Sequence, residues 1–198
     1  MIRKVVQYGH PVLRKKGERV ETITPAIQAL IQDLLETMHN AHGIGLAAQQ
    51  IGEALQVTVV DVRSVENRSS TLELNGKPVS VEDFMPLVLV NPEVKPSGEP
   101  FAGLEGCLSF REVFADISRP ETVDVEALNQ KGECIGFRCG GLLARVIQHE
   151  VDHLNGILFI DRMDARTKSE LNPQLADIQA RTRATLKDRR QIKPGREA

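Results

Sequence analysis

Cysteine is scarce in this chain, with three among 198 residues. An odd number of cysteines does not fit a disulfide framework and is more typical of a protein from a reducing compartment. Cys134 and Cys139 are separated by four residues, and no second such pair exists to complete a zinc ribbon. We therefore expect both to be small buried residues of a strand. Cys107 lies in a different segment.

Long apolar runs are also missing. No stretch approaches the roughly 18 apolar residues that a membrane helix requires, and the first residues lack the apolar core of a signal peptide. We therefore expect a cytoplasmic protein that has no membrane partner. The length of 198 residues favours a single domain, 1–198.

An overall excess of positive charge is absent, because the net charge is −2. The composition thus gives no general reason to expect nucleic acid, and no DNA partner is predicted. The distribution is uneven, however, since the segment from Arg166 onward contains nine Lys or Arg against four Asp or Glu. A helix is expected there over about 167–190. Its basic side chains either face a polyanion or form a solvated helix face.

The remaining pattern predicts an α+β fold. Thr24 and Pro25 indicate a helix start, and an apolar face follows until the glycines of 39–45. Strands are predicted over 56–62, 87–90, 122–128, 133–138 and 157–160, with a polar surface stretch over 63–83 that could form a hairpin. Helices and strands do not alternate in βαβ order. We therefore expect short antiparallel strands and hairpins around a central helix, with a C-terminal helix.

The central helix carries His149-Glu150-Val151-Asp152-His153, an H-E-x-x-H run. On a helix, the two histidines lie one turn apart and can share one metal ion, while Glu150 lies to one side, near a water on that ion. The alternative is a coincidental pair of buried histidines without a metal. That alternative would bury polar groups with no evident partner.

A catalytic site of this kind needs a third protein ligand. A protease pattern that places a third histidine six residues after His153 is excluded, because Phe159 occupies that position. A downstream glutamate, Glu170, is a second option and would make the chain a metalloprotease that cleaves internal peptide bonds. Cys107 is the third option, since a cation would stabilise its thiolate.

Three motifs make the resemblance to a known family specific. The segments Gly43-Ile44-Gly45-Leu46-Ala47-Ala48-Gln49-Gln50, Glu105-Gly106-Cys107-Leu108-Ser109 and Gln148-His149-Glu150-Val151-Asp152-His153 resemble, in this order, the signature motifs of peptide deformylase. The similarity covers roughly residues 5–165 and includes His10-Pro11-Val12-Leu13-Arg14, Asn91-Pro92 and Leu154-Asn155-Gly156-Ile157-Leu158-Phe159.

The resemblance implies that Cys107, His149 and His153 bind the metal. It implies that metal-bound hydroxide attacks the formyl carbon of N-formylmethionyl nascent peptides, releasing formate, with Glu150 as general base and acid. The side-chain amide of Gln50 and the backbone N–H of Leu108 would then stabilise the oxyanion.

The resemblance also implies the substrate contacts and the metal. Gly43, Ile44 and Gly45 would pair with the peptide backbone, Gly106 would belong to the same binding set, and an apolar pocket would take the methionine side chain. A thiolate ligand favours iron(II) or zinc over calcium or magnesium. The resemblance implies iron(II), with zinc, nickel or cobalt able to replace it, and a ribosome contact through the basic C-terminal helix.

The chain departs from the family pattern near the second motif. Phe110 is followed by Arg111 where proline is usual, and Ser118 stands where proline is common. An arginine that often binds the carboxylate side of the peptide aligns with Phe114. These departures bear on substrate preference and catalytic efficiency. They leave a catalytically impaired deformylase-like protein as an alternative to the active enzyme.

Overall fold

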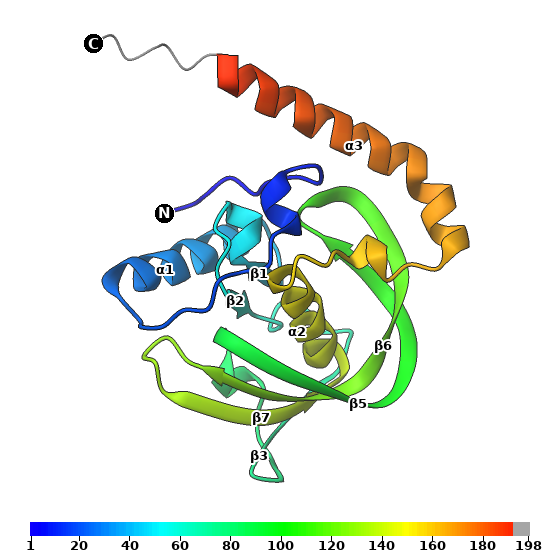
Figure 1. Cartoon of the computed structure of the whole chain (residues 1–198). Coiled ribbons are helices and arrows are strands. Elements are labelled where there is room, and N and C mark those ends of the chain that lie inside the picture. Colours follow the sequence, from blue (N-terminus) through cyan, green and yellow to red (C-terminus); the bar gives the residue numbers. More distant parts are fainter. Residues whose placement is uncertain (192–198) are drawn as a thin grey trace.

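A curved antiparallel sheet wraps around helix α2 (Gly141–Leu154), which lies near the centre of the molecule (Figure 1). The structure is a computed structural model that describes residues 1–191. The sheet has the strand order β1-β2-β5-β6-β7-β3-β4. Its strands are β1 Gly45–Ala47, β2 Val57–Val60, β3 Ser70–Leu74, β4 Lys77–Pro78, β5 Leu87–Cys107, β6 Phe110–Leu128 and β7 Cys134–Gly140.

Two strands are much longer than the sequence pattern predicted. β5 has 21 residues and β6 has 19, and they pair along most of their length. Register shifts interrupt this pairing at Val90/Glu93, Ser97/Pro100 and Gly106/Cys107. Such bulges bend a strand and increase its twist, so the long hairpin can curve around α2 (Figure 1).

Helix α1 (Pro25–Asn40) covers the β1–β2 end of the sheet. It begins as predicted, because Thr24 caps it by accepting a hydrogen bond from the N–H of Ile27 at 3.3 Å. Its apolar face is buried in a cluster with β1 and β2. Four buried residues of α1 belong to this cluster: Leu30, Ile31, Leu34 and Met38.

Helix α2 is buried over most of its surface, which is unusual for a helix with so many polar residues. It follows β7 directly, and its first residue, Gly141, has a φ of +66°. A side chain at this position would overlap the carbonyl oxygen of Ser69, so glycine allows the sharp transition from strand to helix. On its sheet-facing side, Leu142, Leu143 and Ile147 join the main hydrophobic cluster.

Short 3-10 helices and the C-terminal helix complete the chain. The 3-10 helices are η1 Pro11–Arg14, η2 Ala48–Ile51, η3 Glu82–Phe84 and η4 Phe159–Asp161. Helix α3 (Ala165–Gln191) agrees with the predicted helix over 167–190 and anchors to the body through Leu175, which is 4% exposed. The polar stretch 63–83 does contain a hairpin, formed by β3 and β4.

The strand predicted over 157–160 is wrong. These residues form a turn and η4, which is closed by a hydrogen bond from the Leu158 N–H to Asp161 Oδ2 at 2.9 Å. Phe159 is buried beside Phe110, with ring centroids 5.1 Å apart. Local capping and aromatic packing therefore determine the conformation of this segment, although its apolar residues fit the pattern of a buried strand equally well.

The expectation for the two strand cysteines is half wrong. Cys139 is 1% exposed, whereas Cys134 is exposed. Residues five positions apart in a strand face opposite sides of the sheet, so both could not face the same core. Burial raises the pKa of the Cys139 thiol to about 12, so this cysteine remains an uncharged core residue.

Among residues 1–191, no helix combines the length and the apolar character needed to span a membrane. The single-domain prediction includes residues 192–198, which lie outside the described part of the chain.

Candidate active site

The C-terminal end of β5 meets α2 at three potential metal ligands. Cys107 Sγ lies 3.2 Å from His153 Nε2, and the rings of His149 and His153 are 5.1 Å apart between centroids. One ligand atom from each of the three residues lies within 4.8 Å of the other two. The structure thus brings together the three residues that the sequence singled out as ligands.

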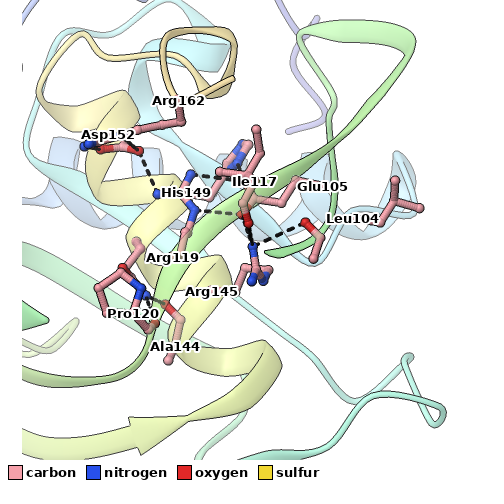
Figure 2. A network of polar contacts seen from close by, with 12 residues as sticks. Leu104, Glu105, Ile117, Arg119, Pro120, Ala144, Arg145, His149, Asp152 and Arg162 are labelled. Atoms are coloured by element: carbon pink, nitrogen blue, oxygen red, sulfur yellow. Dashed lines mark hydrogen bonds and ion pairs between the residues drawn. The ribbon is translucent and has the colours of Figure 1, made fainter. Parts of the chain in front are cut away.

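A buried carboxylate fixes the orientation of His149. Glu105 Oε2 lies 3.0 Å from His149 Nδ1, which leaves the Nε2 atom of His149 available to a metal. Glu105 also accepts two hydrogen bonds from Arg119, at 2.7 and 3.0 Å, and one from Arg145 at 2.8 Å (Figure 2). Burial alone would raise the pKa of Glu105, but hydrogen bonds from His149 and Arg119 lower it to about 2.

The same network extends along α2 to Asp152. Arg119 Nη1 donates to Asp152 at 2.8 Å, and Arg162 Nη2 donates to the other oxygen of this carboxylate at 2.7 Å (Figure 2). Arg119 and Asp152 are 4% and 6% exposed. Since buried charges are costly unless they are paired, these contacts compensate the cations and anions packed behind the histidines.

Glu150 lies beside the ligands but outside this network. It is 3% exposed, and its Oε2 atom has no hydrogen-bond partner among the described residues. Burial raises the pKa of Glu150 to about 7. A side chain at Gly45 would overlap the Glu150 carboxylate, so this glycine leaves the space that Glu150 occupies.

Gln50 presents its amide nitrogen to Cys107. Its Oε1 atom accepts a hydrogen bond from the Ala47 N–H at 2.8 Å, and its Nε2 atom lies 3.5 Å from Cys107 Sγ and 3.4 Å from Ser109 Oγ. The carbonyl oxygen of the adjacent Leu108 accepts a hydrogen bond from Gln7 Nε2 at 3.0 Å. The amide group of Gln50 and the backbone at Leu108 therefore have fixed positions around Cys107.

A cavity of about 1450 Å³ connects these groups with the surface. All the site residues predicted from the sequence line it except His153, which is 1% exposed and contacts Cys107. Leu142 and Val146 of α2 form part of the inner wall. The predicted residues on the wall are Gly43, Ile44, Gly45, Gln50, Gly106, Cys107, Leu108, His149 and Glu150.

The donor set fits a soft divalent cation. One thiol and two imidazoles converge, and His149 has the hydrogen-bonded second nitrogen that is typical of histidine ligands. Burial lowers the pKa of His153 well below its usual value, which favours the neutral ring that a metal requires. With three protein ligands, a tetrahedral ion would keep one position open for water or substrate.

The alternative ligand Glu170 is not near this cluster. Its carboxylate forms an exposed ion pair with Arg166 one turn earlier in α3, with an N–O distance of 2.9 Å. This contact argues against the metalloprotease alternative, in which Glu170 completes the site.

Sequence reasoning missed the charged residues behind the ligands. Glu105 was noted only as part of a motif, and Arg119 was not singled out. One signal was present, because Arg145 interrupts the apolar pattern of α2 between residues that are buried. A charged residue at such a position requires a buried partner.

The family model for polypeptide deformylase matches residues 2–169. The chain belongs to the polypeptide deformylase family. Among curated relatives, the peptide deformylase of Opitutus terrae is 43% identical over 189 residues, which cover 94% of this chain and 98% of the relative. The peptide deformylase of Methylacidiphilum infernorum is 43% identical over 178 residues, 90% of this chain and 93% of the relative.

Solved deformylase structures agree with the fold. The crystal structure of a peptide deformylase from Legionella pneumophila superposes with a TM-score of 0.75 at 32% identity, over 98% of this chain and all of the other. That of Synechococcus elongatus in complex with actinonin has a TM-score of 0.71 at 35% identity, over 90% and 84% of the two chains. The predicted family, the α+β class and the removal of formyl groups from the N-termini of nascent peptides are therefore confirmed.

Proposed function

We propose that Cys107, His149 and His153 hold one divalent ion and that Glu150 moves the proton during hydrolysis of the formyl amide. The observation that supports this assignment is the convergence of the three ligand atoms within 4.8 Å, with Glu150 Oε2, which has no hydrogen-bond partner among the described residues, beside them. When bound, the ion supplies a lowered pKa for water and polarisation of the formyl carbonyl.

The residues of the chain would perform the remaining steps. Glu150 accepts a proton from the attacking water and delivers it to the amine nitrogen as the C–N bond breaks and formate leaves. The Gln50 amide and the Leu108 N–H donate hydrogen bonds to the oxygen that becomes negatively charged. Loss of one such donor typically reduces the rate by about 10²–10³.

The cavity wall provides the substrate contacts in this proposal. Gly43, Ile44 and Gly45 pair with the peptide backbone, and Gly106 approaches it from β5. The methionine side chain enters the inner part of the cavity beside Leu142 and Val146, where it buries its apolar surface.

We assign iron(II) as the native ion, with zinc, nickel or cobalt as replacements. A thiolate with two imidazoles is a soft donor set that suits these ions better than calcium or magnesium. The proposal places the enzyme in the cytoplasm, where nascent chains are made.

The test measures formate release from formyl-Met-Ala-Ser under anaerobic conditions, together with the metal content. Glu150→Gln should retain the metal and lose turnover, because an amide cannot shuttle a proton. Retention of more than about a tenth of wild-type turnover would refute the role of Glu150. Metal-loaded wild-type protein that releases no formate would favour the impaired deformylase-like alternative.

We also propose that the basic segment of α3 contacts ribosomal RNA. Arg181, Arg183 and Lys187 are exposed on this helix, although Arg181 also pairs with Asp177 at 2.8 Å. The side chains of Arg189 and Arg190, which belong to the same predicted basic segment, lie outside the described part of the chain.

Replacing Arg181, Arg183 and Lys187 by glutamate should abolish salt-dependent binding to purified ribosomes, because phosphate contacts dominate such binding. The matched control replaces three exposed cations elsewhere, Lys95 of β5, Lys131 in the turn between β6 and β7, and Arg138 of β7, and should bind like wild type. Equal binding of the α3 variant and this control would remove the proposed contact. Formate release by both variants would show that they are folded.

A further inference from the structure

The loop that connects α1 to β1, residues 41–44, contains a strained residue. His42 has a φ of +53°, in the left-handed region that residues other than glycine seldom adopt. Its N–H donates a hydrogen bond to the His39 carbonyl at 3.1 Å. The N–H of the next residue, Gly43, donates to the Met38 carbonyl at 3.0 Å. Because a strained residue persists only where neighbouring contacts fix it, this loop requires further support.

The same loop forms part of the cavity wall. Residues 41–44 all line the cavity that contains Cys107. A Cβ atom at Gly43 would lie 2.7 Å from Cδ1 of Leu108, so the loop backbone packs closely against the residue that follows Cys107. A shift of the loop would therefore change the shape of the cavity beside the three potential ligands.

Asp61, which directly follows β2, contacts both ends of the loop. Its backbone N–H donates a hydrogen bond to the Ile44 carbonyl at 3.0 Å. Its Oδ2 atom lies 3.0 Å from Nε2 of His39, in the last turn of α1. An ionised carboxylate only accepts hydrogen bonds, so His39 Nε2 carries a proton and is the donor. A single residue thus connects the end of α1 with the start of β1.

The Asp61 carboxylate is itself held in place. Asp61 is 6% exposed, and it accepts hydrogen bonds from Arg63 Nε at 2.9 Å and Arg63 Nη2 at 2.6 Å. Hydrogen bonds from Arg63 contribute most to lowering the pKa of Asp61 to about 2, so the carboxylate is charged at neutral pH. A charged acceptor in a fixed position is therefore available to His39.

We propose that the contact between Asp61 and His39 positions residues 41–44 for substrate binding. This inference rests on the proposed function, in which residues 43–45 pair with the peptide backbone. Asp61 and His39 do not line the cavity themselves, so they act through the loop and not on the substrate. Without their contact the loop samples other conformations, and ordering it on binding reduces the affinity for the peptide.

The first test measures hydrogen exchange of the backbone amides of residues 41–45 in the full chain. His39→Ala should increase their exchange rate by about fivefold or more, because local opening no longer breaks the contact with Asp61. His39→Gln should exchange like wild type, since its side-chain amide can still donate a hydrogen bond to the carboxylate.

A matched control on the same helix is Gln32→Ala. This variant removes an exposed hydrogen bond of α1, from Gln32 Nε2 to Glu36 Oε1 at 2.9 Å. Gln32 lies outside the cavity. The exchange rate of residues 41–45 and the kinetic constants should therefore equal those of wild type.

The second test measures KM and kcat for formate release from formyl-Met-Ala-Ser. His39→Ala should raise KM by about three- to tenfold and change kcat by less than about twofold, because the lost contact supports substrate and transition state equally. His39→Gln should restore the wild-type KM. A loss of global stability alone would not change the KM of the folded enzyme, so this pattern separates positioning from a purely structural role.

Asp61→Asn reads the same contact from its other side. The neutral amide is a weaker acceptor, so this variant should raise KM as His39→Ala does. In the double variant, Asp61→Asn should add less than about twofold to the KM of His39→Ala, because the contact is already absent.

The outcomes separate this inference from the proposed function. Wild-type exchange of the loop in His39→Ala and Asp61→Asn, or an unchanged KM in both, would overturn the positioning role while formate release leaves the proposed function intact. If Asp61→Asn does not fold, the two His39 variants decide the question, since the His39 side chain is half-exposed. Metal-loaded wild type that releases no formate would overturn the proposed function and, with it, this inference.

Discussion

At the scale of single residues, Glu105 both orients a proposed metal ligand and pairs with buried arginines. It orients His149 and receives hydrogen bonds from both Arg119 and Arg145, all in the interior. Removal of its charge would leave two buried guanidinium groups with reduced compensation, and breaking such a buried pair typically costs about 3–5 kcal/mol. Glu105 therefore both stabilises the interior of the site and orients His149.

We expect Glu105→Gln to lower the free energy of unfolding by about 3 kcal/mol, because a neutral amide cannot compensate the buried arginines. Urea denaturation measures this loss. The control Glu133→Gln changes an exposed carboxylate and should cost less than about 0.5 kcal/mol. A loss in Glu105→Gln no larger than that of the control would contradict the account.

The ligands and the base were predictable because their chemistry is unusual and their spacing is short. His149, Glu150 and His153 lie on one helical turn, so helix geometry alone places them together. Arg119 and Asp152 were not predictable as partners, because 32 residues of strand and helix separate them and a charge is usually exposed. Their pairing depends on how β6 crosses α2.

At the scale of elements, one carboxylate at the end of β2 links neighbouring segments. Asp61 accepts hydrogen bonds from Arg63, at 2.6 and 2.9 Å, and lies 3.0 Å from His39 Nε2 of α1. Hydrogen bonds from Arg63 contribute most to lowering the pKa of Asp61 from 3.8 to about 2. Asp61 thus stabilises the fold in its charged form.

The sign of the pH dependence follows from this lowered pKa. The stabilisation should be complete above the unfolded value of 3.8 and should disappear as the pH falls through about 2. Asp61→Asn should cost about 1 kcal/mol at pH 7, less than a full conversion of the shift because solvent screens the exposed partners. Denaturant unfolding of wild type and Asp61→Asn at pH 7 and at pH 2.5 measures the cost of the substitution at each pH. A cost that is the same at both pH values would contradict this assignment.

The elements themselves were only partly predictable. The start of α1 could be predicted from the Thr24 cap, and the β3–β4 hairpin from the polar stretch 63–83. Both signals depend only on neighbouring residues. The lengths of β5 and β6 could not be predicted from the alternation of apolar and polar residues. The bulges in their pairing change which residues face the core along both strands. The segment 157–160 was misread because a short apolar run fits a strand and a buried turn equally well.

At the scale of the whole molecule, the curved sheet creates the site. It brings Cys107 at the end of β5 to His153 on α2, although they are 46 positions apart in the chain. Sequence spacing cannot predict this meeting, and the family resemblance supplied the expectation. In the proposed function, these two elements share one ion through Cys107, His149 and His153.

X-ray absorption spectroscopy of the metal-loaded protein identifies the atoms bound to this ion. We predict one sulfur neighbour, at about 2.3 Å if the ion is zinc, together with two imidazole nitrogens at about 2.0–2.1 Å. The sulfur signal should disappear in Cys107→Ser, with a lower metal content, because an alcohol is a poor anionic ligand. Wild-type protein that binds its metal without a sulfur neighbour, or a Cys107→Ser variant with an unchanged spectrum, would show that Cys107 is not a ligand.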